Sequence, residues 1–158
     1  MNQLLVAVIL SALPVFELRA GLPIAVNYAL KNNFPVIPIF LLILFVNISV
    51  IFLIFLFLDF LHESLMKISL YKKIFGYYLR RLRKKADKLE KKLDVYGFFA
   101  LSFFVAIPLP GTGAWTGCLV SWLLGLDRKK SIVAISLGVF IAGIIILLAS
   151  LGVLNLIG

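Results

Sequence analysis

The chain has 158 residues, of which 63% are hydrophobic, with 14 phenylalanines and a formal net charge of +9. A single soluble core of this size could not bury so much apolar surface, so the composition excludes a soluble globular domain and indicates an integral membrane protein. The only cysteine is Cys118, which excludes an internal disulfide, and the sequence has no cysteine and histidine cluster for a metal ion. We expect no metal and no cofactor.

The first apolar run, residues 4–16, is too short to cross a membrane, because as a helix it extends about 20 Å against a hydrocarbon core of about 30 Å. It leads into Glu17 rather than into a small-residue cleavage site, so we expect it to be retained and not removed as a signal peptide. A charged break follows, and Pro23 is placed to begin a second short helix over residues 24–30. The sequence therefore predicts a re-entrant hairpin over residues 1–33.

Residues 34–58 carry no charge and extend about 37 Å as a helix, which predicts a transmembrane span. We interpret Asn47, near its centre, as the donor or acceptor of an interhelical hydrogen bond rather than as a substrate contact. Three ionisable residues follow at the end of the span, namely Asp59, His62 and Glu63. We interpret them as solvated groups at the membrane interface, although they also resemble a proton relay.

Basic residues concentrate in the linker that comes next, residues 59–95. Eleven lysines or arginines lie between Lys67 and Lys92. In a soluble protein this density would suggest nucleic acid, but between membrane segments it is typical of a cytoplasmic loop held against anionic lipid headgroups. Apolar residues over 71–93 recur with helical spacing, which predicts an amphipathic helix on the membrane surface. We expect anionic lipid as a partner and no nucleic acid.

The second half of the chain repeats this order of breaks and spans. Residues 96–107 are again too short to cross, a proline and glycine break follows, and residues 114–126 return to a polar segment. We interpret residues 96–127 as a second re-entrant hairpin and residues 128–154 as a second transmembrane helix. The fold class that we predict is an all-α membrane protein with two inverted repeats joined by the basic linker.

The distribution of positive charge predicts the orientation of these segments. The cationic residues at 128–130 lie on the same side as the basic linker only if the second hairpin re-enters the membrane. The positive-inside rule then places residues 64–95 and 127–130 in the cytoplasm of a multi-pass cell-membrane protein, with both termini outside.

Two ionisable residues of the first break are the main candidates for a functional site. Glu17 and Arg19 precede Gly21 and Pro23 in this break, and an ionisable group at bilayer depth needs a partner or water. We interpret both side chains as facing one cavity, where Arg19 would hold an anionic group and Glu17 would exchange a proton. The alternative is that the hairpin lies shallow and both side chains reach the membrane surface.

The second break supplies backbone groups rather than charge, and its candidate site residues are Pro108, Pro110, Gly111, Thr112 and Gly113. We expect the prolines to end the incoming helix, the glycines to allow tight turning, and Thr112 to cap the outgoing helix. The amides at that helix start suit an anion such as phosphate or carboxylate. The alternative is close helix packing, because small-xxx-small patterns start at Gly113 and Gly138. We interpret Trp122 as an interfacial anchor, while Trp115 could contact substrate.

The two breaks together resemble a known family. Residues 17–25 (ELRAGLPIA), a basic loop and residues 108–117 (PLPGTGAWTG) are similar to the small multidrug export protein family, which is similar in plan to the DedA/VTT superfamily. The resemblance implies paired re-entrant hairpins that face each other in a transporter or lipid-translocating protein. In DedA-type proteins, acidic and arginine residues of the hairpins are linked to proton coupling and headgroup binding. Glu17 and Arg19 match such roles here, and the second hairpin has no arginine.

These observations lead to two hypotheses about function. The first is a proton-coupled transporter or flippase for an anionic headgroup or small solute. The second is a non-transporting assembly or lipid-organising protein, in which Glu17 and Arg19 pair to lock the hairpin. We expect no enzyme activity, because the sequence offers no nucleophile and base, no paired intramembrane carboxylates and no metal set. We also expect a homo-oligomer, because two spans and two hairpins would leave hairpin backbone near lipid.

Overall fold

The structure is a computed structural model that describes residues 3–14, 16–65, 67, 90–109 and 111–157. Within these residues the chain is all-helical and has no strand. Its six helices are α1 (Gln3–Ala12), α2 (Glu17–Lys31), α3 (Val36–Leu65), α5 (Glu90–Ala106), α6 (Ala114–Leu123) and α7 (Arg128–Ile157). The predicted all-α fold is confirmed for this part of the chain. Most of the predicted amphipathic helix over residues 71–93 lies outside it.

The two long helices, α3 and α7, are apolar enough to cross a membrane, over Val36–His62 and Arg128–Val153. α3 begins directly after Pro35, and Pro38 lies in its first turn, where a missing N–H removes no helical hydrogen bond. The outward side chains are apolar as well: Phe45 is 69% exposed on α3. A continuous apolar outer surface of this kind suits lipid rather than water. The prediction of two long apolar helices is therefore confirmed.

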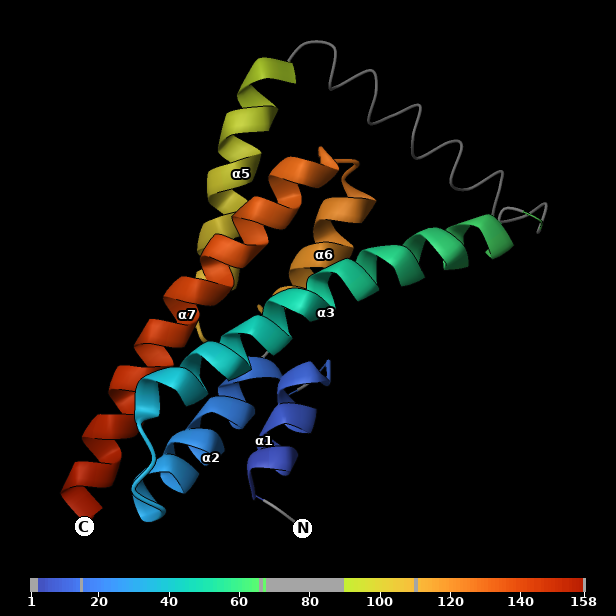
Figure 1. Cartoon of the computed structure of the whole chain (residues 1–158). Helices are drawn as coiled ribbons and strands as arrows, with labels where there is room; N and C mark the ends of the chain where they lie inside the picture. Colours follow the sequence, from blue (N-terminus) through green and yellow to red (C-terminus); the bar gives the residue numbers. More distant parts are fainter. Residues whose placement is uncertain (1–2, 15, 66, 68–89, 110, 158) are drawn as a thin grey trace.

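The four shorter helices are arranged as two hairpins (Figure 1). α1 and α2 pack side by side, and their outer ends lie at the lower end of the view, close to the N-terminus. α5 and α6 also contact each other, but their outer ends lie at the upper end. α7 runs from one of these ends to the other, and α3 crosses the molecule obliquely. The inner ends of the two hairpins consequently meet in the middle of the bundle.

The first break lies earlier in the chain than the sequence predicts. α1 ends at Ala12 and α2 begins at Glu17, so Gly21 and Pro23 lie inside α2, and the predicted separate helix over residues 24–30 is wrong. The physical reason is that Glu17 itself has a left-handed backbone, with φ of 47°, and so turns the chain without a glycine. Gly21 serves close packing instead, because a Cβ there would overlap the side chain of Ser11 on α1.

A close helix approach in the second half also depends on glycine. A Cβ at Gly138 of α7 would lie 2.7 Å from the backbone oxygen of Ser102 on α5 and 2.7 Å from the Cβ of Val105. Real Cβ atoms do not approach other atoms so closely, so only glycine lets α5 and α7 pack at this distance. This contact supports the close-packing interpretation of the small-residue pattern at Gly138.

The turn between α6 and α7 uses two local signals that the sequence interpretation overlooked. Gly125, with φ of 65°, follows the end of α6, and the amides of Gly125 and Leu126 donate to carbonyls of the last helical turn. Asp127 then accepts a hydrogen bond from the amide of Lys130 at 2.9 Å and so caps the start of α7. α6 therefore ends at Leu123 rather than at the predicted residue 126.

The ionisable residues at the end of α3 are only partly solvated. The side chain of Asp59 is 41% exposed, yet it accepts a hydrogen bond from Arg128 at 2.6 Å. His62 meets Trp122 edge to face, with the ring centroids 5.4 Å apart. The side chain of Glu63 lies outside the described part of the chain. Asp59 thus connects α3 to the start of α7, and His62 connects it to the end of α6.

Candidate functional site

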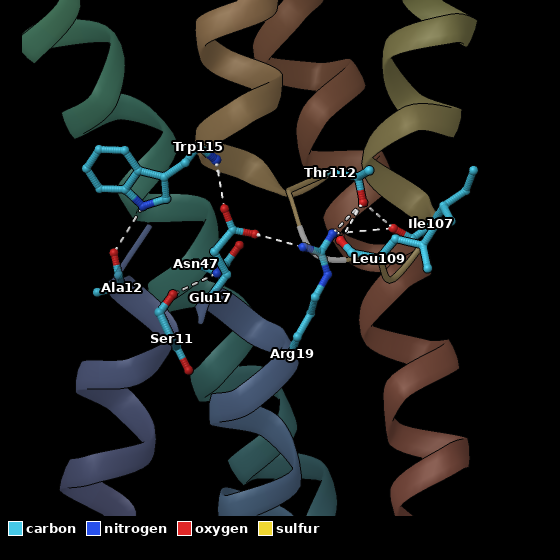
Figure 2. Close-up of polar contacts among 9 residues, drawn as sticks. All are labelled: Ser11, Ala12, Glu17, Arg19, Asn47, Ile107, Leu109, Thr112 and Trp115. Carbon is cyan, nitrogen blue, oxygen red and sulfur yellow. Dashed lines mark hydrogen bonds and ion pairs between the residues drawn. The ribbon is translucent and has the colours of Figure 1, made fainter. Parts of the chain in front are cut away.

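Glu17 lies where the inner ends of the two hairpins meet (Figure 2). It is buried at the start of α2, and its Oε1 accepts a hydrogen bond from the backbone N–H of Trp115 at 3.0 Å. Trp115 belongs to the first turn of α6, where backbone N–H groups have no partner within the helix and carry partial positive charge. The carboxylate of the first hairpin therefore caps a helix of the second.

Arg19 contacts the opposite kind of helix end. Its Nη2 donates to Thr112 Oγ1 at 2.7 Å and to the carbonyl oxygen of Ile107 at 3.3 Å, directly after α5 ends (Figure 2). A cation is favourable near a helix C-terminus, where carbonyl groups carry partial negative charge. The first hairpin thus places the Glu17 carboxylate at the start of α6 and the Arg19 guanidinium at the end of α5.

The two charged side chains do not form a hydrogen bond with each other. Glu17 Oε2 and Arg19 Nη1 are 3.9 Å apart, which is beyond hydrogen-bond distance. A cavity of about 10 Å³ adjoins both residues and Asn47, about the space that one water molecule needs. Each charge is therefore held mainly by its hydrogen bonds to the second hairpin and only at longer range by its neighbour.

The backbone at the end of α1 is also bonded by side chains from other helices. Asn47 Nδ2 donates to the carbonyl oxygen of Ser11 at 2.8 Å, and the indole Nε1 of Trp115 donates to that of Ala12 at 3.1 Å (Figure 2). A membrane interior offers little water for such groups, so these bonds allow the helix to end there. The interpretation of Asn47 as an interhelical hydrogen-bonding residue is confirmed. Trp115 bonds the protein's own backbone.

Thr112 does not cap α6 as predicted. The N-cap residue is Gly113, and it makes no side-chain cap hydrogen bond. The Thr112 hydroxyl instead donates to the carbonyl of Ile107 at 2.6 Å or that of Leu109 at 2.9 Å, while it accepts from Arg19. The prediction is wrong because Glu17, distant in sequence, bonds the start of α6. Thr112 therefore turns back toward the loop and positions Arg19.

The two glycines of the second break have different roles. Gly111 has φ of 84°, a left-handed conformation that glycine adopts without steric cost, so tight turning is confirmed for this residue. Gly113 has φ of −88°, which any residue can adopt, and a Cβ there would overlap the Glu17 carboxylate. Close approach, and not tight turning, explains Gly113. Pro108 lies in the break as predicted, and Pro110 lies outside the described residues.

The backbone of Glu17 is strained. A left-handed φ of 47° costs a residue with a Cβ on the order of 1 kcal/mol, and such conformations concentrate at functional sites. The surrounding contacts hold this conformation: the Glu17 amide donates to the carbonyl of Leu13 at 3.0 Å, and the carboxylate bonds Trp115. Strain and burial of a charged side chain thus occur at the same residue.

An open cavity of about 470 Å³ lies beside Arg19, within the range of about 300 to 1,000 Å³ that is usual for ligand sites. Arg19 and Pro23 of α2 and Pro108 of the second break border it, and five residues of α7 between 145 and 153 form the remaining wall. Glu17 is absent from this wall and lies behind Arg19. Gly21 faces α1, because a Cβ there would meet Ser11 and Ala7.

A comparison with known families adds the identity of the chain. The sequence model of the family described as "Putative small multi-drug export protein" matches residues 17–145, which include α2, α3, α5, the second break, α6 and α7 as far as residue 145. The chain belongs to this family. No curated protein and no solved structure matched it. Membership in an export family, together with two long apolar helices, indicates localisation in a membrane.

In this member of the family, the sequence interpretation missed the contribution of α7 to the cavity. Residues such as Ile145 and Ala149 border it, but an apolar helix face gives the same sequence pattern whether it meets lipid, another helix or a cavity. The amides at the start of α6 were expected to bind an anion such as phosphate or carboxylate. The structure adds that the Trp115 amide bonds the carboxylate of Glu17 in the same chain, a partner that the sequence interpretation did not name.

Proposed function

We propose that the chain is a membrane transporter for an organic anion, with proton exchange at Glu17. The observation that supports it most directly is the meeting of Glu17 and Arg19 with two broken helix ends beside an open cavity. Charged side chains inside a membrane bundle are costly and usually mark substrate or ion pathways. Broken helices that meet at such charges are typical of the binding sites of secondary transporters.

The proposed mechanism couples the proton to the anion through the contacts of the two hairpins. A protonated Glu17 would be a weaker acceptor for the Trp115 amide and would no longer attract Arg19. An anion on the remaining donors of Arg19 would neutralise its charge and so weaken its hydrogen bonds to Ile107 and Thr112. Either event loosens the contact between the hairpins, and alternating exposure of the site follows if they then move apart. No catalytic step is part of this proposal.

The proposed topology has both hairpins re-entering the membrane, from opposite sides, as inverted repeats similar to those of the DedA/VTT superfamily. The opposite directions of the α1–α2 and α5–α6 hairpins support it (Figure 1). The positive-inside rule then assigns residues 64–95 and 127–130 to the cytoplasm and both termini to the outside. In a Cys118→Ser background, an impermeant thiol reagent should label Leu30→Cys in intact cells and leave Lys129→Cys unlabelled. External labelling of Lys129→Cys would contradict the topology.

Dye efflux from cells tests the transport proposal. Cells that produce the chain should release preloaded fluorescein, an anion, faster than control cells, and should release the cation ethidium at the control rate. Glu17→Gln and Arg19→Gln should lose this gain when dye release is divided by the amount of folded protein in the membrane. The matched control variants are Asp59→Asn and Lys31→Gln, which neutralise exposed charges. The proposal fails if the chain accelerates neither dye or if Glu17→Gln is fully active.

A non-transporting assembly or lipid-organising protein is a second candidate, and one observation favours it. The side-chain hydrogen bonds of Glu17 and Arg19 with described residues all go to protein groups of the second hairpin, as a structural lock requires. In that case Glu17→Gln would lower the yield of folded protein, and the wild-type chain would not affect dye release. Normal yield with lost efflux would favour transport.

Self-association and lipid binding complete the proposal. Large apolar side chains are exposed on the hairpins as well as on the long helices; Phe103 of α5, for example, is 69% exposed. A homo-oligomer would cover part of this surface, and anionic lipid headgroups would bind the basic linker. Crosslinking in native membranes tests the first point, and a monomer only, at every crosslinker concentration, would contradict it.

A further inference from the structure

The open cavity beside Arg19 combines one cation with an apolar wall. Among the described residues that border it, Arg19 alone is charged. Ser150 is the other polar residue of the wall, and its hydroxyl donates to the carbonyl of Ile146 in its own helix at 2.7 Å. Everything else that borders the cavity is proline, alanine or a branched aliphatic residue. A ligand would therefore meet one positive group and an otherwise apolar surface.

Arg19 retains hydrogen-bonding capacity for such a ligand. A guanidinium has five N–H donors, and the bonds to Thr112 and Ile107 both come from Nη2. Nη1 is 3.9 Å from the Glu17 carboxylate, and neither Nη1 nor Nε has a hydrogen-bond acceptor within the described part of the chain. Three donors are thus left on a side chain that borders the cavity and is 17% exposed.

Two kinds of ligand fit this surface poorly. A small polar anion such as inorganic phosphate would satisfy Arg19 but would leave the α7 wall without apolar contact. A neutral amphiphile would fill the apolar wall but would leave the donors of Arg19 buried without an acceptor, which is costly. Only a molecule with an anionic group and an apolar body satisfies both parts of the site.

We propose that this cavity binds an amphipathic organic anion, with its anionic group on the remaining donors of Arg19 and its apolar body along α7 between Ile145 and Val153. This inference rests on the proposed function, because it names the substrate class of the same site. An alkyl or aryl phosphate, sulfate or carboxylate has this chemistry, since charge-assisted hydrogen bonds to a guanidinium are strong. The source is either a lipid headgroup with its chain or a free amphiphile.

Equilibrium dialysis tests the proposal without requiring transport. The full chain in phosphatidylcholine nanodiscs is dialysed against radiolabelled octyl phosphate, and binding to empty nanodiscs is subtracted. We expect saturable binding that unlabelled octyl phosphate displaces and that octanol or inorganic phosphate at equal concentration does not. Arg19→Gln should weaken binding about tenfold or more, because it removes charge-assisted hydrogen bonds. Equal competition by octanol or by inorganic phosphate would overturn the proposal.

A second variant keeps the test informative if Arg19→Gln does not fold. Ala149 borders the cavity, so Ala149→Phe would fill it and should weaken octyl phosphate binding about tenfold or more. Leu148 is the matched control, because it is the preceding residue of α7, is 64% exposed and does not border the cavity. Leu148→Phe should bind as the wild type does. Unchanged binding by Ala149→Phe would overturn the proposal.

Nanodiscs with added phosphatidic acid identify the source of the anion. Weaker octyl phosphate binding in them would support a lipid headgroup as the natural ligand, and unchanged binding would support a free amphiphile; the shared chemistry holds in both cases. The dialysis result is also separate from the efflux result. Binding without dye efflux would support the site and contradict transport, whereas efflux without octyl phosphate binding would support transport and overturn the amphipathic anion.

Discussion

The described part of this protein contains two ion pairs, one between α3 and α7 and one within α2, and they differ in both distance and burial. Asp59 and Arg128 join α3 to α7 with 2.6 Å between their charged atoms, and their side chains are 41% and 50% exposed. Glu17 and Arg19 lie 3.9 Å apart at the meeting point of the hairpins, with side chains that are 4% and 17% exposed. The pair with the shorter distance between its charged atoms is therefore the pair with the more exposed side chains.

This difference shows that the distance between two charged atoms does not by itself predict how much the ion pair contributes to stability. An exposed pair contributes about 0 to 1 kcal/mol, because solvent screens it and two long side chains must be ordered. Removing one partner of a buried pair costs about 3 to 5 kcal/mol, because the other charge stays buried without compensation. In this protein the buried charges are also tied to the ends of α5 and α6, so their loss disturbs backbone as well.

The largest expected effect is that of Arg19→Met, which leaves the buried Glu17 carboxylate without its neighbouring cation. We expect a loss of about 3 to 5 kcal/mol in the free energy of unfolding, measured by denaturant titration in micelles. Adding Glu17→Gln should recover part of this loss, because the uncompensated charge is then removed. If the effects of the two substitutions are instead additive in the double-mutant cycle, the two charges do not stabilise each other. The buried pair would then not differ from the exposed pair in the way proposed.

A smaller effect is expected when the approach of the two hairpins is blocked. Gly113→Ala places a Cβ against the Glu17 carboxylate and should lower the free energy of unfolding by about 1 to 3 kcal/mol. The matched control is Gly152→Ala, where a Cβ meets no atom within 4 Å. The control should be neutral or slightly stabilising, because alanine favours helix over glycine by about 1 kcal/mol. Equal effects of both substitutions would mean that the Gly113 contact does not restrict the site.

The smallest effect is expected for the exposed pair. Asp59→Asn should change the free energy of unfolding by less than about 1 kcal/mol, and the difference should shrink as salt is added. Arg128 keeps its second contact in this variant, because its guanidinium lies 5.2 Å from the centre of the Phe55 ring. The same titration measures the effect. A loss in the free energy of unfolding as large as that of Arg19→Met would show that burial does not explain the different contributions of the two pairs to stability.

Local signals explain the features that could be predicted from the sequence. Long uncharged runs predicted α3 and α7, because helix length and hydrophobicity are properties of one segment. Glu17 and Arg19 were selected because a charge in an apolar run is unusual whatever surrounds it. The prediction for Pro23 was wrong because it relied on a local signal alone. Proline often begins a helix, but here the left-handed turn at Glu17 starts α2 well before Pro23.

The sequence by itself determined an all-helical membrane protein with two long apolar helices, two breaks and a charged pair next to the first break. Only the tertiary structure decided that Glu17 bonds the start of α6, that Arg19 bonds the end of α5, and that α7 completes a cavity beside Arg19. The physical reason is that each of these contacts joins segments about a hundred residues apart. Such contacts depend on glycines that allow close approach and on which helix end each charge reaches, and neither is encoded within a single segment.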